Sequence, residues 1–68
     1  MNEEIVERLI KLRRSNGYSQ QELANVSGVS KSTISRIERG IMSPDVRTLE
    51  KLANTYNMIL TIKFEKEE

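Results

Sequence analysis

The side chains best suited to bind another molecule form a short polar series between Ser30 and Gly40. They are hydroxyl and cationic residues spaced so that they would lie along one side of a helix: Lys31, Ser32, Ser35, Arg36 and Arg39. Ile34 and Ile37 are three positions apart and share the opposite side. Ser and Thr are mediocre helix formers, so their density here favours close approach to a partner over helix stability. This chemistry is that of recognition.

The composition argues against an enzyme or a metal protein. The chain contains no His and no Cys. It therefore lacks the usual acid–base group near neutral pH, and zinc would have to be held by carboxylates alone. Without Cys it can form no disulfide either. We expect no catalytic residue, no metal ligand and no cofactor.

The residues before the polar series predict a second short helix and a tight turn. Ser19 and Glu22 have the spacing of a capping box, in which each side chain satisfies a backbone N–H at a helix start. Gly28 can adopt the positive φ that ends such a helix, and Ser30 is a good N-cap for the next one. Two helices joined by a glycine turn, with a cationic and hydrogen-bonding outer side on the second, are typical of the helix-turn-helix that reads DNA.

Two further helices are expected to flank this pair, over residues 2–15 and from Ser43 or Asp45 to about residue 57. Either Ser43 or Asp45 could cap the last helix, after a loop that contains Pro44. Apolar residues recur at helical spacing in both helices. In the first helix Ile5, Leu9 and Leu12 are expected to face the core, and the last helix continues through Val46, Leu49, Leu52, Ala53 and Tyr56.

The distribution of charge is more informative than the net charge of +1. Between Arg8 and Arg47 there are eight basic residues and three acidic ones, which leaves +5, while both ends of the chain are acidic. A basic middle is compatible with a phosphate-facing surface. On charge alone, an ordinary mixed surface explains the pattern equally well.

After residue 57 the hydrophobic period changes from helical to alternating, which predicts a strand over residues 58–65. The composition is β-branched and aromatic, and one apolar side comprises Met58, Leu60, Ile62 and Phe64. A single strand has open edges that favour pairing. The simplest arrangement is a two-fold homodimer in which the strand pairs antiparallel with its copy through these four residues. A fifth helical turn is the alternative, and residues 66–68 are expected to be a solvated tail.

The stretch 19–40 resembles the helix-turn-helix of the Cro/CI (XRE) family of bacterial and phage repressors, and the similarity extends from Leu9 to about Tyr56. The matching residues include Gln20, Glu22, Leu23, Ala24, Gly28, Val29, Ser30, Thr33, Ile34, Ile37, Glu38, Arg39 and Gly40. The resemblance implies a mainly α, four-helix, lambda-repressor-like DNA-binding domain over residues 1–57. Residues 58–65 would add a C-terminal β-strand for dimerisation, which resembles that of HipB-like antitoxins, whereas the family more usually has a fifth helix.

The resemblance also implies roles for individual residues. The second helix of the motif would enter the major groove, with base contacts from Lys31, Ser32, Ser35 and Arg36. Phosphate contacts would come from Gln20, Thr33, Arg39 and Ser43. Arg13 and Glu38 would form a largely buried ion pair between the first helix and the end of the recognition helix. Ile41 and Met42 stand where the family often has Lys or Arg, which weakens the phosphate contact of that loop.

These observations predict a transcriptional repressor that binds an inverted repeat in double-stranded DNA as a homodimer. The alternative is an antitoxin that clamps a toxin protein and regulates its own operon. No apolar run approaches the roughly 20 residues needed to span a bilayer, and no signal-peptide pattern opens the chain. We therefore expect a cytoplasmic protein with no membrane partner.

Overall fold

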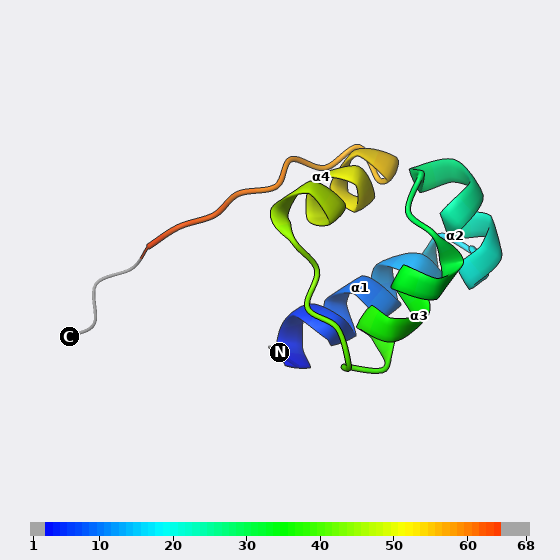
Figure 1. Ribbon diagram of the computed structural model, residues 1–68. Helices are drawn as coiled ribbons and strands as arrows, with labels where there is room; N and C mark the ends of the chain where they lie inside the picture. The colour runs from blue at the N-terminus through cyan, green and yellow to red at the C-terminus, as the bar shows by residue number, and fades with distance from the viewer. Residues whose placement is uncertain (1–2, 65–68) are drawn as a thin grey trace.

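The computed structural model describes residues 3–64, and within them the chain forms four helices. These are α1 (Glu3–Ser15), α2 (Gln20–Ser27), α3 (Lys31–Glu38) and α4 (Val46–Thr55). The four expected helices are confirmed, and the expected start of the first one at residue 2 lies outside the described residues. α3 packs against α1 and α2, and α4 packs against α2 (Figure 1). No helix within residues 3–64 is long and apolar enough to cross a membrane.

Local hydrogen bonds fix the start of α2 and the turn that follows it. The Ser19 hydroxyl accepts from the Glu22 N–H at 3.0 Å, and the Glu22 carboxylate accepts from the Ser19 N–H at 2.9 Å, which completes the capping box. Gly28 ends the helix with φ of 78° and donates its N–H to the Ala24 carbonyl. The Ser30 hydroxyl then caps α3 by accepting from the Thr33 N–H at 3.1 Å. The turn is thus fixed by hydrogen bonds between residues three or four positions apart in the sequence.

The core lies where α2, α3 and α4 meet. Its buried members are Leu23, Val29, Ile34, Ile37 and Leu52, each no more than 6% exposed. Val29 belongs to the turn itself, so the connection between α2 and α3 is anchored in the core as well as hydrogen-bonded. Burying a side chain of this size stabilises a fold by about 1.5–3 kcal/mol. A core of so few residues leaves little excess stability.

The apolar residues of α1 are less buried than their spacing predicts. Leu9 and Leu12 are half-buried, and Ile5 is 40% exposed. The expectation that Ile5 faces the core is wrong, because Ile5 lines a groove between α1 and α4 that is open to solvent. Periodicity identifies the apolar side of a helix but not whether another element covers it.

The start and end of α4 have well-defined caps. Asp45, and not Ser43, is the N-cap, since its carboxylate accepts from the Thr48 N–H at 2.7 Å. At the other end Asn57 has φ of 57° and donates its N–H to the Asn54 carbonyl, while Met58 donates to the Ala53 carbonyl at 2.8 Å. This pair of bonds is a Schellman motif. It stops the helix and turns the chain away from the α4 axis.

Residues 58–64, which we call the arm, run away from the helices (Figure 1). The arm forms neither the predicted strand nor a fifth helical turn. Exposure reaches 91% at Ile59 and 102% at Phe64. A strand is defined by ladder hydrogen bonds to a neighbour, and within residues 3–64 the single chain offers none. Pairing of the arm with a second copy stays a prediction, and residue 65 and the tail 66–68 lie outside the described residues.

Gly28→Ala tests the turn between α2 and α3. We expect a loss of about 1–2 kcal/mol in the free energy of unfolding, because a left-handed backbone carries that cost for a residue with a Cβ. A Cβ at this position would meet no atom within 4 Å, so the cost comes from the backbone alone. Urea unfolding measures the loss. Gly28→Asn is the matched control and should lose less, since Asn tolerates this conformation; equal midpoints for Ala and wild type would contradict the argument.

Candidate nucleic-acid interface

The outer side of α3 is exposed and polar. Lys31, Ser32 and Arg36 are exposed and Ser35 is half-buried, whereas Ile34 and Ile37 on the opposite side are 3% and 2% exposed. The apolar pair thus anchors the helix and turns the four predicted base-contacting residues outward. With only eight residues, α3 depends on this anchorage, because an isolated helix of that length is unstable in water.

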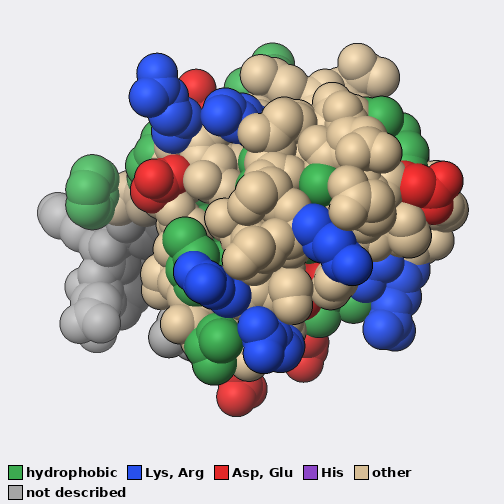
Figure 2. All heavy atoms as spheres, turned by 45° about the vertical axis from the view of Figure 1, so that its right-hand side comes forward, with side chains coloured by type: hydrophobic (Ala, Val, Ile, Leu, Met, Phe, Trp, Pro, Cys, Tyr) green, Lys and Arg blue, Asp and Glu red, His purple; other side chains and the backbone are tan. Residues whose placement is uncertain are grey.

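Figure 2 brings the α2–α3 side of the molecule forward and shows its surface character. Lys and Arg side chains surround an area of uncharged polar side chains and backbone, and acidic side chains lie mainly towards the margins. Such a surface can accept a polyanion without repulsion and still bring hydrogen-bonding groups close to it.

Three of the four predicted phosphate-contacting residues already bond within the chain. Gln20 donates from its amide to the Glu38 carboxylate at 3.2 Å. The Thr33 hydroxyl accepts from the Ser30 hydroxyl at 2.9 Å, and Arg39, which caps the end of α3, donates from Nε to the Ser35 carbonyl. Ser43 is exposed in the loop before α4. Because an amide or a guanidinium has several N–H groups, Gln20 and Arg39 keep donors for a further partner.

Arg13 and Glu38 form a buried ion pair that joins α1 to the end of α3. Arg13 Nε lies 2.7 Å from Glu38 Oε2, and Arg13 Nη2 donates to Glu38 Oε1 at 2.8 Å. Their side chains are 11% and 10% exposed. Arg13 Nη1 also donates to the Tyr18 carbonyl at 2.9 Å, in the segment between α1 and α2. One guanidinium thus fixes three parts of the chain with bidentate geometry.

Burial and hydrogen bonding act in opposite directions on Glu38. Burial favours its neutral form and raises the pKa, but the hydrogen bonds from Arg13 and Gln20, with the charges of Arg13 and Arg14, outweigh it. The pKa of Glu38 therefore lies below its ordinary value of 4.5. The hydrogen bond to Glu38 likewise raises the pKa of Arg13. Both groups are charged at neutral pH.

Residue spacing alone did not reveal two members of this network. Gln20 stands at the start of α2 and its amide bonds to Glu38, a contact between residues eighteen positions apart that no local pattern signals. The Tyr18 ring packs against Tyr56 with ring centroids 6.3 Å apart, which links the segment before α2 to the end of α4. The second contact joins a tyrosine that follows α1 to one that follows α4, and no local spacing signals it.

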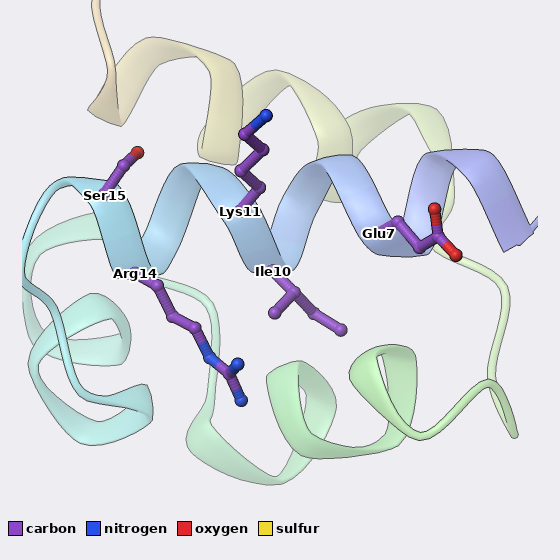
Figure 3. A pocket seen from close by; sticks show the side chains of 5 residues that line it. All are labelled: Glu7, Ile10, Lys11, Arg14 and Ser15. Atoms are coloured by element: carbon purple, nitrogen blue, oxygen red, sulfur yellow. The ribbon is translucent and has the colours of Figure 1, made fainter.

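A shallow hollow along α1 does not form a second site. Its lining residues all come from one helix, and in Figure 3 the side chain of Lys11 points to the side of α1 opposite to Ile10 and Arg14. Convergent groups are what binds a small ligand. Nor do residues 3–64 contain a group of three or more His, Cys, Asp or Glu side chains placed to hold a metal ion.

A short pair of helices joined by a glycine turn, held by a buried ion pair and presenting a polar side on the second helix, defines a helix-turn-helix domain. A family model described as helix-turn-helix, HTH_3, matches residues 9–59. The chain belongs to this family, and the Cro/CI (XRE) resemblance is confirmed at that level.

Proteins similar to this chain are named as transcriptional regulators. SlrR of Bacillus subtilis (strain 168) is 45% identical over 65 residues, which cover 93% of this chain and 43% of SlrR. PuuR of Escherichia coli (strain K12) is 39% identical over 61 residues, 90% of this chain and 33% of PuuR. A crystal structure of an HTH_3 family transcriptional regulator from Vibrio cholerae has a TM-score of 0.76 and 40% identity over 81% of this chain and 31% of that one.

The chain thus spans less than half the length of SlrR and of PuuR. SinR of Bacillus licheniformis, 38% identical over 94% of this chain, is matched over 60% of its length. The shared part is the helix-turn-helix region, so the similarity concerns this unit. The names of these relatives give no support to the antitoxin alternative, and the strand resembling that of HipB-like antitoxins is not shown.

Glu38→Gln tests the ion pair through the pH dependence of stability. The pKa of Glu38 is lower in the folded chain, so the unfolded chain takes up the proton first. The contribution of Glu38 is therefore fully present above its ordinary pKa of 4.5 and is lost as the pH falls below that value. At neutral pH we expect the variant to lose about 3 kcal/mol in the free energy of unfolding, because Arg13 stays buried without its partner.

Urea unfolding between neutral and acidic pH measures both effects, and Glu22→Gln is the matched control. The pKa of Glu22 is also lowered, by its hydrogen bonds to Ser19, but Glu22 is exposed. The control should keep most of its stability at neutral pH. An R13M/E38L double variant should recover part of the loss of E38Q, since it leaves no unpaired charge. Equal stability of E38Q and wild type at every pH would show that the pair contributes nothing.

Proposed function

We propose that this chain is the DNA-reading part of a sequence-specific transcriptional repressor. The observation that carries the proposal is the outer side of α3, where Lys31, Ser32 and Arg36 are exposed beside half-buried Ser35. Membership of the helix-turn-helix family and the names of its relatives support it. Such a protein shares a compartment with the chromosome, so the cytoplasmic location expected from the sequence belongs to the proposal. The activity is binding and requires no reaction.

In the proposed complex α3 lies in the major groove. Arg36 and Lys31 are assigned to guanine, whose major-groove edge presents two acceptors, and only Arg can donate to both at once in a fork. Ser32 and Ser35 are short, so they allow the helix to approach and can bond to several bases. The roughly 1–3 kcal/mol of discrimination that a bidentate pair supplies makes Arg36 the main source of sequence preference.

Phosphate contacts supply most of the affinity in this proposal. They come from Gln20, Thr33, Arg39 and Ser43. Gln20 stands at the N-terminus of α2, where backbone N–H groups favour an anion. The Gln20 amide donates to Glu38 with one N–H and keeps a second one for phosphate. With one N–H on Glu38 and the other on a phosphate, the Gln20 amide would connect the DNA backbone to the buried ion pair.

The proposed regulator acts as a homodimer, because one recognition helix reads too few base pairs for specificity in a genome. The arm supplies the interface through Met58, Leu60, Ile62 and Phe64, an apolar series that is poorly covered in the single chain. A two-fold dimer presents two α3 helices to successive major grooves about 34 Å apart and therefore recognises an inverted repeat.

Selection of bound duplexes from a random DNA pool tests the proposal directly. We expect enrichment of two inverted half-sites whose centres lie about one helical turn apart. Binding to the enriched duplex should weaken steeply between about 50 and 200 mM salt, as phosphate-led recognition requires. A pool that gains no shared sequence after repeated rounds would refute sequence-specific binding, and a single half-site would refute the paired arrangement.

Arg36→Ala separates base recognition from phosphate binding. We expect the variant to lose about 1–3 kcal/mol on the selected duplex and little on unrelated DNA, because Arg36 is assigned to a base edge. Arg39→Ala should instead weaken binding to every duplex alike, as removal of a phosphate contact does. Lys51→Ala removes an exposed charge from α4 and is the control. Titration of each of the three variants with the selected duplex and with unrelated DNA measures the loss of binding free energy. An equal loss on both duplexes for Arg36→Ala would reassign that residue to a phosphate contact.

A further inference from the structure

An apolar groove between α1 and α4 has no cover of its own. Its volume is about 380 Å³. Its lining is mainly apolar and includes Ile5, Leu9 and Leu12 of α1 and Leu49 and Leu52 of α4, together with Arg8 and residues 58–61 of the arm. In a chain of this size such a groove beside exposed apolar residues marks a surface for association.

The arm crosses the groove at its root and then leaves it. Leu60 is half-buried there, whereas Met58 is 45% and Ile59 91% exposed. In an extended strand Ile62 and Phe64 would share the side of Leu60, and in the single chain they are 61% and 102% exposed. The apolar side of the arm is therefore covered only where the arm begins.

Two-fold symmetry limits how two arms can pair. Directly opposite residues of an antiparallel pair point to the same face of the ribbon, and a two-fold axis through the ribbon places equal residues of both copies on the same face. Two residues that lie opposite each other therefore both have even numbers or both have odd numbers. The register centred on Thr61 is the one that pairs each of the four apolar interface residues with another of the four: it sets Met58 opposite Phe64 and Leu60 opposite Ile62.

We propose that two arms pair in this register and that Ile62 and Phe64 of each chain pack on the α1–α4 groove of its partner. The reason is geometric: the register places the tip of one arm beside the root of the other, and the root lies on the groove. The occupant is a second copy of this chain, since the last described residues of a chain's own arm lie away from its helices (Figure 1). The inference rests on the proposed homodimer and adds its register and contact surface.

Single cysteine variants test the register, because the chain contains no Cys. In T61C the two thiols stand opposite each other with Cα atoms about 4.5–5.5 Å apart, within the range of a disulfide. In K63C each thiol lies opposite Ile59 of the other copy, so the two thiols are four residues, or about 13 Å, apart along the strands. Both residues are exposed. Under mild oxidation T61C should appear as a linked dimer on a non-reducing gel, and K63C should stay largely unlinked.

A tryptophan at the tip tests the packing on the groove, because the chain contains no Trp. The indole of F64W should emit at shorter wavelength than free tryptophan and resist a soluble quencher. Ile5→Lys in the same chain should remove both effects, because it replaces an apolar lining residue of the groove with a charged one. Val26→Lys is the matched control, since Val26 is a β-branched residue, 55% exposed, on α2; it should leave the emission unchanged.

Sedimentation of the same samples distinguishes the possible failures. A monomer at all concentrations would overturn both the homodimer and this inference, while the DNA selection still tests sequence recognition separately. A dimer in which K63C links as readily as T61C would overturn the register. A dimer in which the indole of F64W stays fully exposed would overturn the contact with the groove and leave the homodimer standing.

Discussion

The buried pair of Arg13 and Glu38 is the interaction on which the rest of this small structure depends. Helices of eight residues do not hold their shape alone, and the buried apolar core is too small to fix their orientation with much to spare. The guanidinium meets a carboxylate from α3 and a carbonyl from the segment before α2. A buried charge pair has one satisfactory geometry, so it contributes more to orientation than to net stability.

That orientation has a direct bearing on recognition. Ile34 and Ile37 are nearly inaccessible, and this fixes the rotation of α3 about its axis. Glu38, at the last turn of α3, fixes where the helix ends relative to α1. A helix held at both points can present Ser32 and Arg36 at constant positions, and bidentate contacts to bases need such constancy. The orientation of the polar side of α3 is therefore determined by the burial of Ile34 and Ile37 on its opposite side.

The features that the sequence predicted well are those determined within a few residues. The capping box at Ser19, the left-handed Gly28 and the cap at Asp45 are local hydrogen-bond patterns, and all are present. The exposure of Ile5 and the bond from Gln20 to Glu38 depend on elements distant in sequence, and no spacing encodes them. The predicted strand shows the same limit: alternation marks the two sides of the arm, but a ladder requires a second chain.

The left-handed Asn57 has a consequence that reaches beyond its own turn. Among residues 3–64 it is the one non-glycine residue with positive φ, and it sets the angle at which the polypeptide departs from α4. In a two-fold assembly held by the arms, that angle governs the separation of the two DNA-reading surfaces. Operator spacing would then depend on a joint that is not among the proposed base and phosphate contacts. Relatives with the same recognition helix could diverge in target architecture by altering this single backbone bend.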